Sequence, residues 1–311
     1  MKEFETDKIL KLLDDYDDCV RYDDLEWLMK QEKIIIPEGV KEIPAHFFRG
    51  CRFSEIEIPE SIERIGTGAF EFCENLREVK IPAKIRSLPA LCFFGCEDLR
   101  KVRLNDSLIK IGFRCFEGSI RLEKIDLPEK LKAIGFRAFA QCFNLKRISI
   151  PDSATLLEGF VFYNCNQLES IKLPKNITKL PKGLFAYCHS LKKAELPKSL
   201  RLIGKEAFIN CMSLKNVVIP DEVRAIDEEA FKMCFELEKA EFGKHLSSVG
   251  KNAFAHCESL KQIDLNREIK SIESKAFFAC TNLETVYFPE KIEMIAPDSF
   301  DECPNAEIIF Y

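Results

Sequence analysis

The chain has 311 residues, of which 46% are hydrophobic and 31% charged, so it is long enough and apolar enough to bury a large core. Its formal net charge of −5 argues against a general nucleic-acid-binding protein. No stretch approaches the roughly 20 apolar residues of a membrane-spanning helix. Residues 1–18 lack the pattern of a classical signal peptide, and the cellular location stays open.

The N-terminal segment is predicted to be helical. Apolar residues within 2–30 are spaced as in one or two amphipathic helices. An open-ended repeat structure exposes its core at both ends. We therefore expect residues 1–33 to form a helical cap that covers the first strand, at 34–36, and buries Trp27.

Residues 15–26 superficially resemble a calcium-binding loop, with acidic residues at several ligand positions. Cys19 stands at a position where an acid or Asn normally coordinates, and Val20 replaces the glycine that the loop needs for its turn. An acidic connection between two helices is therefore the favoured interpretation.

A 23-residue repeat fills the rest of the chain. After one step of 22, a Phe recurs every 23 residues, and a Cys follows three positions later in every unit except one, where Ser119 replaces it. A fixed period of about 20–50 residues indicates a solenoid, and 23 lies in the leucine-rich-repeat range. The repeated aromatic residues, predicted to form the spine of the core, are Phe48, Phe70, Phe93, Phe116, Phe139, Phe162, Phe185, Phe208, Phe231, Phe254, Phe277 and Phe300.

Each repeat contains a short predicted strand. Val79, for example, lies between Glu78 and Lys80, as in a strand with one buried face, and Pro82 ends the strand because it removes a hydrogen-bond donor. The Ala-Phe-x-x-Cys segment is predicted to form a single helical or 3₁₀ turn. Because one unit cannot bury its own apolar face, the units must stack, with about 13 strands in one parallel sheet. Residues 34–311 are therefore predicted to form one continuous solenoid of about 12 repeats.

The shared motif of these units is Ile-Pro-x-x-Val/Ile/Leu-x-x-Ile-Gly-x-x-Ala-Phe-x-x-Cys-x-x-Leu-x-x-Ile-x-Ile-Pro. It closely resembles the BspA-like leucine-rich repeats, also called the Treponema pallidum type, over residues 34–311. The resemblance implies a right-handed α/β solenoid with a parallel β-sheet on its concave face. It also implies a bacterial or protist surface protein that binds proteins or host matrix, and it implies no enzymatic activity.

The cysteine column is the most conspicuous candidate for chemistry. Stacking would bring its sulfur atoms within about 5 Å of one another, but side chains that all point the same way fit the disulfide torsion of about 90° poorly. The column has no CxxC pair and no His at a spacing typical of zinc ligands. We therefore predict buried structural thiols, without a metal or a cofactor. The four His form no plausible set with a nucleophile and an acid, so no enzyme is predicted.

The solvent-facing strand positions of the predicted concave face form two columns of mostly charged side chains. Neighbouring units would bring six basic residues of these columns into a patch, and a Val and a Tyr follow later in the chain. Charged side chains on a sheet face are also typical of a solvated surface that discourages aggregation, and this alternative stays open. The predicted binding residues are Lys101, Arg103, Lys124, Arg147, Lys172, Lys193, Val218 and Tyr287.

The first functional hypothesis is a non-catalytic scaffold that binds a protein partner through the concave face. The alternative is a surface adhesin that binds acidic glycan or host matrix through the basic patch, with an affinity that falls as salt rises. Phe113 and Phe136 occupy equivalent outer positions, where they form either extra core or a second contact surface. The apolar edge strand at 308–311 is a candidate for pairing with a second copy.

Overall fold

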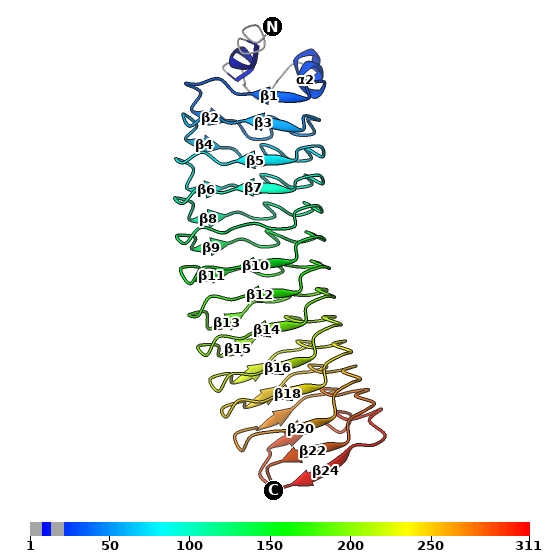
Figure 1. The fold of residues 1–311 in the computed structure, drawn as a ribbon. Helices are drawn as coiled ribbons and strands as arrows, with labels where there is room; N and C mark the ends of the chain where they lie inside the picture. Colours follow the sequence, from blue (N-terminus) through cyan, green and yellow to red (C-terminus); the bar gives the residue numbers. More distant parts are fainter. Residues whose placement is uncertain (1–7, 14–21) are drawn as a thin grey trace. The chain divides into compact units, whose positions relative to one another are not determined.

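The computed structural model describes residues 8–13 and 22–311. The chain divides into two compact units, Met1–Leu145 (unit 1) and Lys146–Tyr311 (unit 2). Within each unit, successive turns of the chain stack on one another (Figure 1). Most turns contribute a longer strand on one leg and a two-residue strand on a second leg. The solvent side of the first leg is called the strand face below.

Unit 1 contains a helical segment at residues 8–13, helix α2 (Tyr22–Met29) and strands that pair in parallel. The first-leg strands form a sheet in the order β1-β3-β5-β7. On the second leg, β2 pairs with β4, and β8 pairs with both β6 and β9. The strands are β1 (Lys33–Ile35), β2 (Glu42–Ile43), β3 (Glu55–Glu57), β4 (Arg64–Ile65), β5 (Glu78–Lys80), β6 (Ser87–Leu88), β7 (Lys101–Arg103), β8 (Lys110–Ile111) and β9 (Ala133–Ile134).

Unit 2 continues the same arrangement with parallel strands on both legs. Its first-leg strands are β10 (Arg147–Ser149), β12 (Ser170–Lys172), β14 (Lys193–Glu195), β16 (Asn216–Val218), β18 (Lys239–Glu241), β20 (Gln262–Asp264), β22 (Thr285–Phe288) and β24 (Glu307–Phe310). Its second-leg strands are β11 (Leu156–Leu157), β13 (Lys179–Leu180), β15 (Leu202–Ile203), β17 (Ala225–Ile226), β19 (Ser248–Val249), β21 (Ser271–Ile272) and β23 (Met294–Ile295).

The three-residue strands follow the alternation that the sequence predicts. In β5 the side chain of Val79 is buried, whereas those of Glu78 and Lys80 are exposed. The same exposed–buried–exposed pattern holds in β10 and β18. A three-residue strand therefore buries one side chain in the core and offers two to solvent on the strand face.

The first-leg strands do not form one continuous sheet, so the prediction of a single sheet of about 13 strands is wrong. In unit 1 residues 124–126 form no strand beyond a single bridge at Lys124. In unit 2 the pairing stops between β14 and β16 and again between β18 and β20. The second leg of unit 2, in contrast, is paired without a break from β13 to β23.

The Ala-Phe-x-x-Cys segments are consecutive turns, not the helical or 3₁₀ turn that the sequence predicts. Around Phe116, for example, Arg114 and Gly118 have φ angles of 51° and 78°, in the left-handed region. These residues direct the intervening amide toward the next repeat, where Phe116 N donates to Ala138 O at 2.8 Å. Amides that bond within the turn, such as Ser119 N to Phe116 O at 3.0 Å, therefore alternate with amides that bond to the next repeat.

The repeated Phe residues form the core of both units, as predicted. In unit 1 the rings of Phe70 and Phe93 are stacked with centroids 5.2 Å apart, and in unit 2 those of Phe231 and Phe254 are 4.9 Å apart. Nearly parallel rings at this spacing are in the offset arrangement that aromatic pairs prefer. The side chains of this column are fully buried except that of Phe300, which is half-buried.

The cysteine column packs beside the Phe column and forms hydrogen bonds with it. Cys188 Sγ donates to the carbonyl oxygen of Phe162, in the preceding turn, at 3.1 Å. Where Ser119 replaces the cysteine, its hydroxyl donates to Phe93 O at 3.4 Å, so this position takes a small side chain that carries a donor. The described cysteines form no disulfide and are buried apart from the half-buried Cys303, which confirms the prediction of buried thiols.

Thiol reactivity tests this arrangement. Burial raises the pKa of Cys188 to about 12, whereas a hydrogen bond with the Cys280 side chain lowers the pKa of the half-buried Cys303. Because the thiolate is the reactive form, Cys303→Ser should remove one fast-reacting thiol when the native protein is titrated with an aromatic disulfide reagent at neutral pH. Cys188→Ser should leave the number of fast-reacting thiols unchanged. A native protein in which Cys188 reacts as fast as Cys303 would contradict the burial of the column.

The described helices lie in unit 1, near its first turns. Leu28 is fully buried, and a Cβ atom added to Gly50 would lie 3.8 Å from Met29 Cε. Trp27 is only half-buried, so the prediction that it is buried is wrong. The Lys8 ammonium lies 4.7 Å from the centroid of the Trp27 ring. The calcium-loop-like segment, 15–26, falls largely outside the described residues.

Candidate functional site

The strand face carries the residues that the sequence analysis selected. Lys101 and Arg103 on β7 and Lys124 belong to unit 1. The other five belong to unit 2, so the predicted basic patch is divided between the two units. These five, on β10, β12, β14, β16 and β22, are Arg147, Lys172, Lys193, Val218 and Tyr287.

In unit 1 all three predicted basic residues are paired with acids. Lys101 Nζ and Arg103 Nε lie 3.3 Å and 2.7 Å from the same oxygen, Oε1 of Glu78. Lys124 Nζ lies 3.0 Å from Asp126 Oδ1. Exposed pairs of this kind contribute only about 0–1 kcal/mol to stability. They do compensate charge locally, which weakens the attraction of this surface for a polyanion.

In unit 2 the predicted residues differ from one another. Lys193 Nζ is paired with Glu195 Oε1 at 2.7 Å. Arg147 and Lys172 lie on the paired strands β10 and β12 and have no salt bridge within the described chain. Tyr287 is half-buried beside β24. Val218 is 59% exposed, in a column that otherwise carries mostly charged residues.

The two interruptions in the first-leg strand pairing of unit 2 share a sequence feature. The central, buried residues of β14 and β18 are Ala194 and Ala240, whereas the neighbouring strands have Ile or Val there. A methyl group fills less of the core than a branched side chain, so these two strands pack differently from their neighbours. Pairing is lost after each alanine strand. The interruption in unit 1 has no such alanine, and nothing in its central residues explains it.

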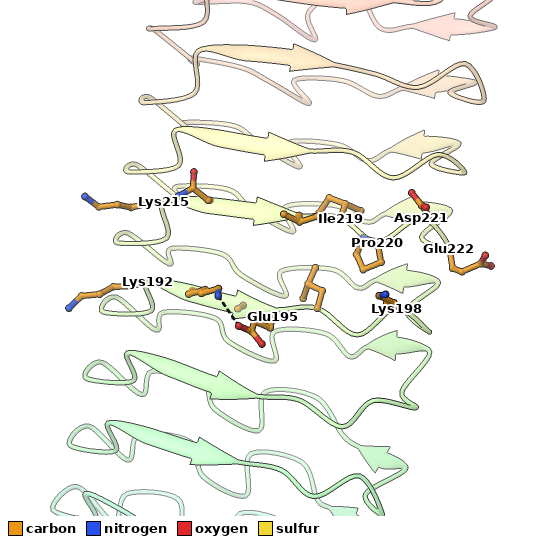
Figure 2. A pocket seen from close by; sticks show the side chains of 13 residues that line it. Lys192, Glu195, Lys198, Lys215, Ile219, Pro220, Asp221 and Glu222 are labelled. Carbon is orange, nitrogen blue, oxygen red and sulfur yellow. Dashed lines mark hydrogen bonds and ion pairs between the residues drawn. The ribbon is translucent and has the colours of Figure 1, made fainter.

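A groove of about 840 Å³ lies over the interruption between β14 and β16 (Figure 2). We call it the first groove. Its apolar part includes Ala194, Leu196, Val218 and Ile219, and four lysines and three acids also line it. Lys192 and Lys215 lie at one end of the groove, and Lys198, Asp221 and Glu222 lie at the other.

The charges of the first groove are unequal once its ion pairs are taken into account. Glu195 is paired with Lys193, and Asp221 with Lys244 Nζ at 3.2 Å. The side-chain hydrogen bond from Lys244 is the main cause of the lowered pKa of Asp221. The remaining lining lysines have no salt bridge in the part of the chain that the structure describes. These lysines are Lys192, Lys198 and Lys215.

The second groove, of about 530 Å³, lies over the interruption between β18 and β20. It has two lysines and three acids in its lining, so its charge balance is the reverse of that of the first groove. Asp264 occupies the repeat position of Val218, and Glu238 occupies that of Lys192. The two grooves therefore share an origin and differ in chemistry.

Sequence analysis did not identify the first groove as a site, although it selected Lys193 and Val218. The signal was present: an alanine at the buried strand position of two units, and a valine among charged residues one unit after the first of them. The loss of strand pairing after a small side chain depends on packing between neighbouring repeats. A comparison of the residues at one repeat position does not reveal it.

A second cluster lies on the turns of unit 1, around a buried carboxylate. Glu117 is 2% exposed, with its oxygens 2.7 Å from Arg137 Nη2 and 2.6 Å from Arg114 Nε. The Arg114 guanidinium also lies 4.6 Å from the centroid of the Phe94 ring. Phe113, predicted as extra core or contact surface, is 45% exposed and stacked on Phe136 at 5.8 Å, so it lies at the surface.

Among residues 8–13 and 22–311, no group of three or more His, Cys, Asp or Glu side chains is placed to hold a metal ion. No helix in these same ranges has the length and apolar character needed to cross a membrane.

The parallel strands, the 23-residue spacing and the Phe and Cys columns define a leucine-rich-repeat solenoid. The family described as BspA type leucine rich repeat region matches the chain over residues 26–123, 110–238 and 201–311, and the chain belongs to this family. Its fold is typically non-catalytic, and the family is generally one of protein-binding or adhesin-like surface proteins.

Solved structures support the fold assignment. A leucine-rich repeat protein from Bacteroides ovatus is 26% identical, with a TM-score of 0.65, and the match covers 90% of this chain and 92% of that one. A leucine rich cell surface protein from Faecalibacterium prausnitzii is 24% identical, with a TM-score of 0.59 and coverage of 90% and 88%. The pneumococcal vaccine antigen PcpA is 21% identical, with a TM-score of 0.59 and coverage of 90% and 79%. No curated protein sequence matched the chain.

Proposed function

We propose that the chain is a non-catalytic scaffold that binds a protein partner through the strand face, with the first groove of unit 2 as the main contact. The observation that carries this proposal is Val218, a β-branched apolar side chain that is 59% exposed within a groove. Exposed apolar groups with a polar rim are typical of protein-binding sites. The lysines and acids around Val218 form such a rim.

The alternative function is a surface adhesin for acidic glycan or host matrix. Arg147 and Lys172 favour it, because they lie on neighbouring strands without a salt bridge in the described chain. The ion pairs of Lys101, Arg103 and Lys124 count against it. Two available cations make a weaker polyanion site than the six predicted from the sequence.

Capture from cell and host extracts at about 0.05 M and about 0.5 M salt separates these functions. The scaffold proposal predicts a protein that is still captured at high salt and is lost with Val218→Asp. Arg147→Glu combined with Lys172→Glu should leave this capture unchanged. Capture that is lost with the double charge reversal and at high salt, and is indifferent to Val218→Asp, would instead support the adhesin.

We also propose three features of organisation. Residues 1–33 form a cap on the first turns of the solenoid, which is supported by the buried Leu28 and by Met29 beside Gly50. Residues 34–311 form the repeat domain. Strand β24 provides an edge for self-association, which is supported by the 54% exposure of Phe310.

A further inference from the structure

The first groove has the features of a site for one kind of segment. Its apolar part is exposed at Val218 and extends through Leu196 to Ile219. Strands β14 and β16 remain neighbours although they are not paired, so a bound chain has room above the groove and not between the strands. An occupant must therefore lie on the strand face and place side chains downward onto the apolar part.

The charge of the groove selects the occupant further. Lys192 and Lys215 lie together at one end and have no salt bridge among the described residues (Figure 2). Their ammonium groups point away from the apolar part, and two unpaired cations at this end favour a carboxylate beyond the apolar part. At the other end, Lys198 is accompanied by Asp221 and Glu222, so that end has no comparable excess of positive charge.

We propose that the first groove binds an extended, acidic segment of a partner protein. The segment places an apolar side chain on Val218 and its acidic residues against Lys192 and Lys215. This inference rests on the proposed scaffold function, and it adds the chemical class of the ligand and the direction in which it lies.

The second groove provides an internal control. It also follows an alanine strand, but Asp264 replaces the exposed valine and Glu238 replaces Lys192, whereas Lys261 keeps the position of Lys215. Both changes remove what the ligand needs, since one adds a carboxylate to the apolar part and the other repels acidic residues. The second groove is therefore not expected to bind the segment.

The probe is a fluorescein-labelled peptide with two Asp residues followed by Leu, Ser and Leu, and its binding is followed by fluorescence anisotropy. One control peptide has Lys in place of Asp, and the other has Ser in place of Leu. We expect both controls to bind at least about tenfold more weakly than the probe. Equal binding of the Leu-free control would overturn the proposal, because charge alone would then explain the binding.

Exchange of residues between the grooves gives the decisive variants. Val218→Asp with Lys192→Glu converts the first groove to the chemistry of the second and should weaken probe binding about tenfold or more. Asp264→Val with Glu238→Lys converts the second groove to the chemistry of the first and should add a second binding site. All four side chains are exposed, and unchanged circular dichroism would verify the fold.

An unaltered affinity in the Val218→Asp, Lys192→Glu variant would overturn the proposal, as would absence of probe binding to the wild-type chain. These failures differ from failure of the proposed function. If Val218→Asp abolishes capture of a protein from extracts while the probe does not bind, the scaffold function stands and only the acidic, apolar ligand class is wrong.

Discussion

Replacement of Phe185 by alanine is expected to destabilise the protein by about 3–5 kcal/mol, because it opens a cavity in the middle of the Phe column. Phe185 is fully buried, and its ring lies 5.9 Å from that of Phe162 and 5.2 Å from that of Phe208, measured between centroids. The loss therefore includes the transfer energy of one ring and its contacts with two neighbours. Urea unfolding followed by circular dichroism measures it.

Val218→Ala is the matched control for this experiment. The side chain of Val218 lies on the strand face of unit 2, which also contains Phe185, and is 59% exposed. The free energy of unfolding should therefore change by less than about 0.5 kcal/mol. A loss below about 1 kcal/mol for Phe185→Ala would contradict the assignment of the Phe column as the core of the solenoid.

The second large effect is expected at Glu117. Glu117→Ala should cost about 2–3 kcal/mol, because removal of one partner from a buried ion pair leaves the other charge uncompensated. The cost is below that of a fully buried pair, since the side chains of Arg114 and Arg137 are 34% and 23% exposed and still reach water. Glu117→Gln, which keeps a hydrogen-bonding group but loses the charge, should also destabilise the protein, by less than Glu117→Ala. A Glu117→Gln variant as stable as the wild type would contradict the role of the charge.

The same carboxylate predicts a pH dependence. Burial alone would raise the pKa of Glu117, but the hydrogen bonds and charges of Arg137 and Arg114 outweigh it, and the pKa lies below its usual value of 4.5. A depressed folded-state pKa stabilises the protein above the unfolded pKa, and the contribution is lost as the pH falls. The stability difference between wild type and Glu117→Gln should be constant above pH 4.5 and shrink below it. A difference that grows on acidification would contradict this account.

The repeat made the core predictable. A side chain that returns every 23 residues must occupy equivalent positions in stacked units, so the columns of Phe and Cys were readable as a buried ladder. Likewise, the alternation around residues such as Val79 predicted a buried centre and two exposed neighbours, and the structure confirms both.

The features that escaped prediction depend on volume and side-chain reach. Ala194 is a conservative change in a hydrophobic pattern, yet its small size accompanies a lost strand pairing and a groove. Lys101 and Arg103 were predicted to be available for binding, but both side chains reach Glu78, one repeat earlier on β5. The left-handed backbone at Arg114 has no signal in its residue type, because the bonds between units impose it.

The central claim, that a protein partner binds the strand face at the first groove, is tested most directly by photocrosslinking. Benzoylphenylalanine is placed at position 218 or, as a control, at the exposed position 179 on the second leg of unit 2. The account predicts a protein crosslinked from 218 and not from 179. Crosslinking from 179 alone, or equally from both positions, would contradict it.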